Sequence, residues 1–220
     1  MTMFLGGSST PALTAAMTFL LVHALYKSAL FMVAGAIDHQ TGTREILKIG
    51  GLGRCMPFTA AATLFATLST AGFPLFIGFV GKEIMYKGAL TEDVFPGLAT
   101  GAALVSNALM TAVAATLALR PFWGQPRKAR PSGEAPWQMW IGPLLIGGIC
   151  LGFGLIPDWV GHWLVEPAVR SIRVTRVDIE LKLFYGFNAP LLLSIATIMM
   201  GGAIYRYRRG LRRSLMHLFA

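Results

Sequence analysis

Long apolar stretches dominate the sequence and restrict it to folds that a lipid bilayer accepts. A helix that crosses a hydrocarbon core about 30 Å thick needs roughly 20 apolar residues. Five stretches meet this requirement to different degrees, and they lie at about residues 13–37, 58–90, 98–119, 137–156 and 187–205. The sequence therefore predicts an all-α integral membrane protein with about five transmembrane helices, in a single membrane domain covering residues 1–220.

The second stretch is too long for one straight helix. Its segment STAGFPLFIGFVGKE, residues 69–83, contains four residues that weaken or interrupt helices, namely Gly72, Pro74, Gly78 and Gly81. We expect this helix to be broken in mid-membrane.

Composition agrees with a membrane location. Hydrophobic residues make up 55% of the chain and charged residues only 13%, whereas soluble domains carry about a quarter charged residues. The formal net charge of +9 would suggest nucleic acid in a soluble protein. Here the basic residues gather between and after the apolar stretches, so the lipid bilayer is the expected partner and nucleic acid is not.

Basic residues concentrate in alternate connections between the predicted helices. Cytoplasmic loops collect Lys and Arg, and the basic segments are the first connection (38–57), the third (120–136) and the tail (206–220). The second connection is acidic, and the fourth (157–186) balances its charges. Five crossings place the three basic segments on one side. We therefore predict a multi-pass protein of the cell membrane, with its N-terminus outside and its basic tail in the cytoplasm.

The fourth connection contains two patterned segments. DWVGHWLVEPAVRSI, residues 158–172, is typical of an amphipathic helix in the membrane interface, with Trp159 and Trp163 at the headgroup level. The segment that follows, residues 173–184, alternates like an exposed strand.

His23 and Lys27 lie near the middle of the first predicted helix, one turn apart on the same face. A lysine at the centre of a span costs about 2.5 to 3.5 kcal/mol on insertion scales. One interpretation is that Lys27 snorkels to an interface, although long apolar segments flank it on both sides. The other is that both groups face the protein interior or a wetted cavity, where desolvation disfavours their charged forms. The pair is a candidate proton relay.

Lys82 is the second candidate, because it follows the Gly and Pro cluster of the second stretch. Backbone groups freed by a helix break persist at membrane depth only where they line a cavity or are buried in protein, and transporters place ion sites at such breaks. Alternatively, Lys82 and Glu83 both lie at the outer interface.

Asp38 and His39 end the first helix in the polar turn IDHQTGTRE, residues 37–45. A helix end followed by a loop explains them, although their place at the cytoplasmic side also suits proton or cation entry. Asp38, His39 and Glu83 are thus candidates for the mouths of a pathway.

Signatures of enzyme chemistry are missing from the sequence. It shows no nucleophile with a base, no phosphate-binding Gly loop and no metal-ligand cluster, and Cys55 and Cys150 have no metal-like spacing. We expect a transporter subunit with no cofactor and no metal, rather than an enzyme.

Four segments closely resemble the A-type subunit of the Mrp-type multisubunit sodium/proton antiporters. They are HALYKSALFMVAGAIDHQTGTRE (23–45), GGLGRCMPFTA (50–60), AGFPLFIGFVGKEIMYKGAL (71–90) and LKLFYGFNAPLLLS (181–194). The A-type subunit is similar to the largest proton-pumping membrane subunit of respiratory NADH dehydrogenase. Such subunits contain two inverted repeats, each with a broken helix and a titratable residue, joined by a polar axis along the membrane.

The resemblance implies that this chain forms the second inverted repeat. It places His23 and Lys27 on the relay between half-channels, and Lys82 on the broken helix as the terminal proton-carrying lysine. It also implies partners, namely several other membrane subunits, and protons and Na⁺ or another monovalent cation as the transported ions. The family's first repeat and its long C-terminal spans have no counterpart in the sequence, so we expect a fragment or one piece of a split subunit.

The expected function is therefore proton translocation within a multisubunit antiporter that exchanges cytoplasmic Na⁺ for external protons. One alternative is a proton-pumping subunit of a redox-driven complex, of the NADH dehydrogenase or hydrogenase type. The other is a structural membrane subunit that transports nothing and pairs its lysines with acidic residues of a partner.

Overall fold

The computed structural model describes residues 10–91, 95–126, 133–172, 179 and 181–218, with side chains as far as residue 208. The elements follow in the order α2 (Thr10–Thr41), η1 (Leu52–Arg54), α3 (Pro57–Ala71), α4 (Ile77–Leu90), α5 (Pro96–Trp123), α6 (Trp137–Leu155), α7 (Pro157–Val160), η2 (Gly161–Val165), α8 (Glu166–Ile172) and α9 (Ala189–Leu218). Within these described ranges there is no β-strand, and the predicted all-α fold is confirmed.

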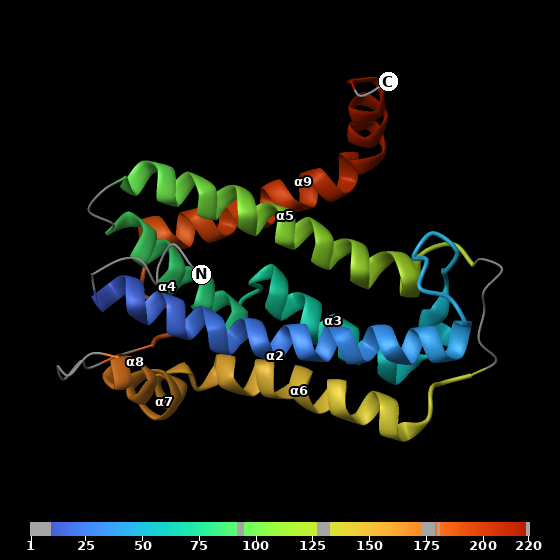
Figure 1. Ribbon diagram of the computed structural model, residues 1–220, viewed down its shortest axis with the longest axis horizontal. Coiled ribbons are helices and arrows are strands. Elements are labelled where there is room, and N and C mark those ends of the chain that lie inside the picture. The colour runs from blue at the N-terminus through green and yellow to red at the C-terminus, as the bar shows by residue number, and fades with distance from the viewer. Residues whose placement is uncertain (1–9, 92–94, 127–132, 173–178, 180, 219–220) are drawn as a thin grey trace.

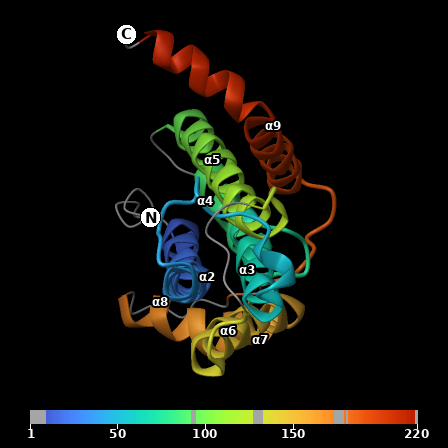
Figure 2. The ribbon, with the colours of Figure 1, turned by 90° about the vertical axis from the view of Figure 1, so that its right-hand side faces the viewer.

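The long helices form a bundle in which α2, α3 and α4 occupy the middle (Figures 1 and 2). Helix α2 packs against α3, α4 and α6, while α5 packs against α3, α4 and α9. Helix α6 therefore covers one side of the central helices, and the α5 and α9 pair covers the other (Figure 1).

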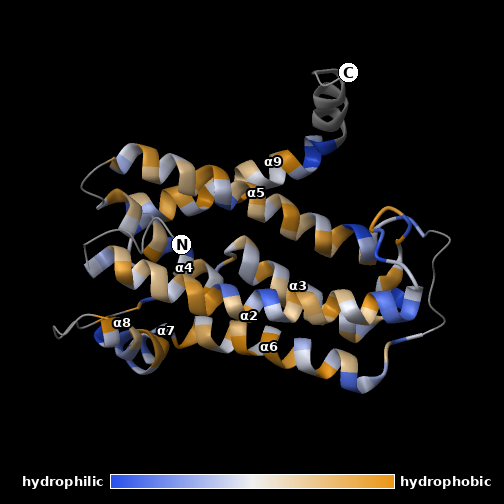
Figure 3. Ribbon diagram, viewed as in Figure 1, coloured by the Kyte–Doolittle hydropathy of each residue, from blue (hydrophilic) through white to orange (hydrophobic). Residues whose placement is uncertain are grey.

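Four described helices are individually long and apolar enough to cross a membrane, and they are Thr10–Thr41, Pro96–Trp123, Trp137–Leu155 and Ala189–Arg208. Together α3 and α4 occupy the predicted second span, 58–90, and the chain between them is not helical. Figure 3 shows hydrophobic residues along these helices and hydrophilic residues where α2 ends and α6 begins. The architecture agrees with the predicted count of about five spans, one of them broken.

The break between α3 and α4 is built from a glycine and a strained turn. Gly72 ends α3 with a φ of 70°, and its N–H bonds to the carbonyl of Ser69. Leu75 also has a positive φ, 77°, which is unfavourable for a residue with a β-carbon. Gly78 then lets α4 pass close to α3, because a Cβ at this position would lie 1.7 Å from the carbonyl oxygen of Ser69.

The segment predicted to lie in the membrane interface is helical from Pro157 to Ile172, with a π-helical turn, η2, in its middle. Its inner face buries Val160, Val165 and Val169 in the main hydrophobic core. Trp159 and Trp163 are exposed, as an interfacial position requires.

Two predictions for the rest of the chain have different outcomes. Residues 173–178 and 180 of the predicted exposed strand lie outside the described residues, and the described part, residues 179 and 181–184, is not a strand. The predicted last span ends at 205, but α9 continues as a helix to Leu218, so the described part of the basic tail is helical. A run without Pro or β-branched residues follows Tyr205, and such a run favours continuation of a helix.

A carboxylate from a distant loop caps α3. Glu134 accepts hydrogen bonds through Oε2 from the N–H of Phe58 at 2.8 Å and through Oε1 from the hydroxyl of Thr59 at 2.6 Å. The first N–H groups of a helix lack intrahelical partners and attract negative charge. Glu134 therefore fixes the loop before α6 to the start of α3.

Replacing Glu134 by Gln removes this charge and one of the two acceptor oxygens. We expect the free energy of unfolding to fall by about 1–2 kcal/mol, measured as a lower thermal unfolding temperature of the full chain in detergent. Glu45→Gln is the control, because Glu45 pairs with Lys48 at a site where both side chains are largely exposed. Equal losses for the two variants would contradict the capping role.

Gly72→Ala introduces a side chain where the backbone φ is positive and where the new Cβ would lie 2.5 Å from Cδ of Lys82. We expect a destabilisation of about 1–2 kcal/mol, again measured by thermal unfolding. In α6, Gly152→Ala is the matched control, because a Cβ there would have no neighbour within 4 Å. A Gly72→Ala variant as stable as the control would show that the break does not need this conformation.

Candidate functional site

Lys82 lies at the break between α3 and α4, inside the bundle. Its side chain is 5% exposed. Its Nζ donates to the carbonyl oxygen of Ala71, the last residue of α3, at 2.6 Å and to Oγ1 of Thr111 on α5 at 3.2 Å. The last carbonyls of a helix lack intrahelical partners and form the negative end of its dipole. The break therefore provides a buried amine with a local environment that tolerates positive charge.

The two acceptors suit Lys82 in either protonation state. An ammonium group has three N–H donors, and the neutral amine keeps two N–H donors and gains a lone pair. Both forms can make the two observed hydrogen bonds, and the remaining N–H or lone pair is left for a proton exchange. None of the ion pairs within the described ranges involves Lys82, so no carboxylate there holds it in the charged form.

Polar side chains from α4, α5 and α9 continue from Lys82 into the bundle. Thr111 donates its hydroxyl proton to the carbonyl oxygen of Asn107 at 2.9 Å and thereby presents lone pairs to Lys82. Nδ2 of Asn107 donates to the hydroxyl of Tyr86 at 3.3 Å. The Tyr86 hydroxyl in turn forms a hydrogen bond with Thr197 on α9. Sequence analysis predicted none of these four residues.

A glycine permits this contact between α5 and α9. A Cβ at Gly201 would lie 2.5 Å from Cβ of Thr111 and 2.8 Å from the carbonyl oxygen of Ala108. Because real side chains do not approach so closely, Gly201 allows α9 to pack directly over Thr111.

Glu83 is also buried, on another face of α4. Its side chain is 2% exposed, and neither carboxylate oxygen has a hydrogen-bond partner among the described residues. It lines a cavity of about 370 Å³ together with Lys87 and with Asn188 and Pro190 at the start of α9. The amine of Lys87 lies over the ring of Tyr185, 5.7 Å from its centroid. Lys82 and Glu83 are thus both buried within the bundle.

His23 and Lys27 are partly buried on α2, and the structure gives His23 a partner that was not predicted. Nδ1 of His23 lies 2.8 Å from the hydroxyl of Tyr26, a buried residue. No hydrogen bond within the described ranges joins His23 to Lys27 or either residue to Lys82. Helix α2 instead approaches α4 through Val22, whose Cγ2 would lie 3.4 Å from a Cβ on Gly81.

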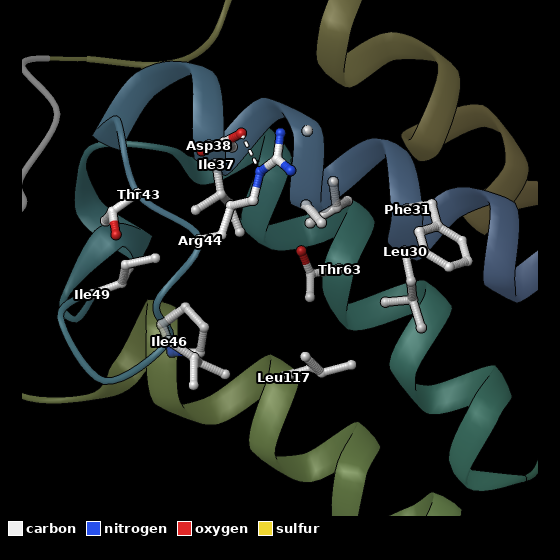
Figure 4. Close-up of a pocket in the computed structure, with 14 residues that line it drawn as sticks. Leu30, Phe31, Ile37, Asp38, Thr43, Arg44, Ile46, Ile49, Thr63 and Leu117 are labelled. Atoms are coloured by element: carbon white, nitrogen blue, oxygen red, sulfur yellow. Dashed lines mark hydrogen bonds and ion pairs between the residues drawn. The ribbon is translucent and has the colours of Figure 1, made fainter.

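Asp38 lies near the end of α2 and lines a second cavity of about 460 Å³ (Figure 4). Its Oδ2 accepts a hydrogen bond from Nε of Arg44 at 2.8 Å, and this bond raises the pKa of the Arg44 guanidinium. The cavity walls are mainly apolar side chains of α2, α5 and the loop after α2, and α3 contributes Thr63. His39 is exposed and does not line this cavity.

A signal for the missed residues was present in the sequence. Tyr86 follows Lys82 by four positions, and Thr111 follows Asn107 by four, so each pair shares one face of an apolar helix. Polar side chains on one face of a membrane helix often bond to a neighbouring helix. The pattern predicts polar faces on both helices, but which faces meet depends on the packing of α4, α5 and α9.

Comparisons with known proteins agree with this architecture. Residues 1–111 match the family described as NADH:quinone oxidoreductase/Mrp antiporter, TM. The A-type subunit of the Na⁺/H⁺ antiporter of Alkalihalophilus pseudofirmus is 31% identical, over 86% of this chain and 26% of that protein. The A1-type subunit of the Na⁺/H⁺ antiporter of Staphylococcus aureus strain Newman is 32% identical, over 86% of this chain and 25% of that protein.

A solved structure of an Mrp complex also matches this chain. A chain of the Mrp complex from Dietzia sp. DQ12-45-1b superposes with a TM-score of 0.85 and 28% sequence identity, covering 99% of this chain and 24% of that chain. This chain thus spans about a quarter of the length of the relatives that it matches. The match over half of its residues shows that the chain belongs to the NADH:quinone oxidoreductase/Mrp antiporter transmembrane family.

Proposed function

We propose that this chain is a proton-translocating membrane subunit, or a part of one, in a multisubunit antiporter that exchanges cytoplasmic Na⁺ or another monovalent cation for external protons. Two named relatives are Na⁺/H⁺ antiporter subunits of the A type, and the matching solved chain is part of an Mrp complex. The proposed partners are accordingly other membrane subunits, and the proposed transported ions are protons and Na⁺.

The observation that carries the proposal is the buried amine of Lys82 on the free end of α3. A lysine held by a carbonyl and a hydroxyl, rather than by a carboxylate, keeps both protonation states accessible. Moving one elementary charge across 100 mV is worth about 2.3 kcal/mol. An energy of this size is enough to drive protons on and off a group whose charged and neutral forms are both accommodated.

In the proposed pathway, protons pass between His23, Lys27 and Lys82 through water, and each lysine alternates between its charged and neutral forms. Asp38 and His39 stand at the cytoplasmic mouth, beside the loop that follows α2. Glu83, in the middle of α4, lines the cavity that also includes Leu90 and Thr91, where α4 ends. This end of α4 lies at the end of the bundle opposite the loop after α2 (Figure 1). This arrangement supplies one half-channel and part of the polar axis, and the other subunits or segments complete the path.

The redox-driven alternative uses the same residues, because the family itself includes NADH:quinone oxidoreductase subunits. It differs in the energy source, since proton flux would then require an electron donor. The structural alternative requires acidic partners for the lysines. Lys82 has a carbonyl and a hydroxyl as its hydrogen-bond acceptors, which supports transport over a purely structural role.

Lys82→Gln tests the proposal because the amide keeps much of the length and hydrogen bonding of the side chain but does not accept or release a proton at physiological pH. We expect Na⁺-dependent proton flux to fall by about 100-fold or more. The assay uses everted membrane vesicles that contain the chain in its native assembly, without an electron donor, and follows the collapse of a preformed pH gradient when Na⁺ is added.

Lys48→Gln is the control, because Lys48 is an exposed lysine paired with Glu45 outside the helices. Its flux should equal that of the unmodified protein. Unchanged flux in Lys82→Gln would reject the transport role of Lys82. Flux that appears only with an electron donor would favour the redox-driven alternative.

We also propose that the N-terminal end of α2 faces outward and that the loop after α2 and the C-terminal end of α9 face the cytoplasm. In a Cys55→Ala and Cys150→Ala background, a cysteine replacing Lys48 should react with a membrane-impermeant maleimide in everted vesicles but not in intact cells. A cysteine replacing Trp163, an exposed residue of the segment at the other end of the bundle (Figure 1), should show the opposite pattern. Reversed labelling of both would invert the proposed topology.

A further inference from the structure

Five buried polar residues lie in the contact between α4, α5 and α9, and each is at most 5% exposed. They are Tyr86 on α4, Asn107 and Thr111 on α5, and Ser194 and Thr197 on α9. We call this set the polar seam. It begins at Lys82, because Thr111 accepts a hydrogen bond from the Lys82 amine.

Hydrogen bonds fix the direction of most hydroxyl groups in the polar seam. Thr197 donates to the carbonyl oxygen of Leu193 at 2.8 Å, so it can only accept from Tyr86. The Tyr86 hydroxyl therefore donates to Thr197 and accepts from Nδ2 of Asn107. Ser194 differs from these residues, because its buried hydroxyl oxygen has no partner among the described residues.

The α9 side of the polar seam leads toward the cavity beside Glu83. Thr197, Ser194 and Pro190 are three and four residues apart and thus share one face of α9. Pro190 and Asn188 line the cavity of about 370 Å³ that also contains Glu83 and Lys87. Thr197, Ser194 and the cavity therefore follow one another along α9 toward the end of the bundle at which α4 terminates and α9 begins.

Polar residues also join membrane helices without any transport role, and the hydrogen bond between Tyr86 and Thr197 fits that explanation. Two observations go beyond it. A buried hydroxyl with no protein partner, as in Ser194, is unfavourable unless another molecule satisfies it. In addition, helix adhesion alone does not require a cavity about one turn from Ser194 along α9.

We propose that the polar seam is the route by which protons move between Lys82 and the cavity beside Glu83, and that Tyr86 and Thr111 are its positioning residues. This inference rests on the proposed function. It adds to that function the path that protons take on one side of Lys82, along the contact of α4 with α9.

The chemistry of this step requires water as the carrier. The Lys82 ammonium releases one N–H proton to a water molecule and becomes a neutral amine, and the proton then passes along successive O–H groups. Because an amide does not give up its protons in this way, Asn107 orients the Tyr86 hydroxyl, and a water molecule bridges from Thr111 to Tyr86. The Tyr86 oxygen accepts a proton as its own hydroxyl proton passes to Thr197, so the number of protons on Tyr86 is unchanged. Thr197 in turn releases its hydroxyl proton, which it otherwise donates to the carbonyl of Leu193, to a water molecule beside Ser194.

The test compares Tyr86→Phe and Thr111→Val in the vesicle assay of Na⁺-dependent proton flux, with flux normalised to the amount of inserted protein. We expect each to lower flux by about fivefold or more, the equivalent of one lost hydrogen bond. Thr116→Val is the matched control, because Thr116 lies on the same helix as Thr111 and also bonds to the carbonyl four residues earlier, at 2.8 Å. Among the described residues, Thr116 makes no hydrogen bond with Lys82.

Two further measurements separate proton movement from helix adhesion. Thr197→Ser, which keeps the hydroxyl, should retain flux that Thr197→Val loses. The ratio of flux in H₂O to flux in D₂O should rise in Tyr86→Phe and stay constant in Thr116→Val. A purely adhesive role would lower the thermal stability of Tyr86→Phe and leave this ratio unchanged.

The outcomes distinguish the polar seam from the proposed function. If Lys82→Gln abolishes flux while Tyr86→Phe and Thr111→Val behave like Thr116→Val, the route is overturned and the function stands. If Lys82→Gln retains flux, the proposed role of Lys82 in transport is rejected, and the route that starts from Lys82 is rejected with it. Loss of flux in Lys82→Gln, Tyr86→Phe and Thr111→Val, with the isotope effect described above, supports the route.

Discussion

The contact between the Lys82 amine and the carbonyl of Ala71 determines how this bundle is organised around its centre. An amine inside a membrane helix is costly, and an interrupted helix leaves carbonyl groups without partners. Each of these costs is reduced by the other, because the free end of α3 accepts hydrogen bonds from the lysine on α4. Gly72 gives the lysine room to lie across the break, and α5 supplies the second acceptor through Thr111.

This reciprocity also explains why the surrounding helices carry polar residues at membrane depth. A break that is open to lipid would leave backbone groups unsatisfied, so α5 and α9 have to cover it. Gly201 brings α9 into close contact with Thr111, and Tyr86 and Thr197 bond across the same contact. The same helices therefore bury the amine and cover the break. Their polar residues provide an environment that suits a group that changes its charge.

The sequence predicted the broken helix and singled out Lys82 beside it because both depend on local features, a Gly and Pro cluster followed by a lysine within an apolar stretch. The partners of Lys82 depend on which helix faces meet, and sequence spacing alone does not specify packing between helices. The bond of His23 to Tyr26 lies within one helix, but the spacing of four residues between His23 and Lys27 favoured a different pair. The α3 cap by Glu134 bridges more than seventy residues, and a local pattern does not reveal it.

The most direct test of this account is a cryo-electron microscopy map of the native assembly in lipid that resolves ordered water, recorded at one acidic and one alkaline pH. The account predicts water within hydrogen-bond distance of the Lys82 amine at the end of α3, with no carboxylate bound to that amine at either pH. A dry Lys82 side chain, paired with an acidic residue of a neighbouring subunit under both conditions, would contradict the claim that this amine exchanges protons.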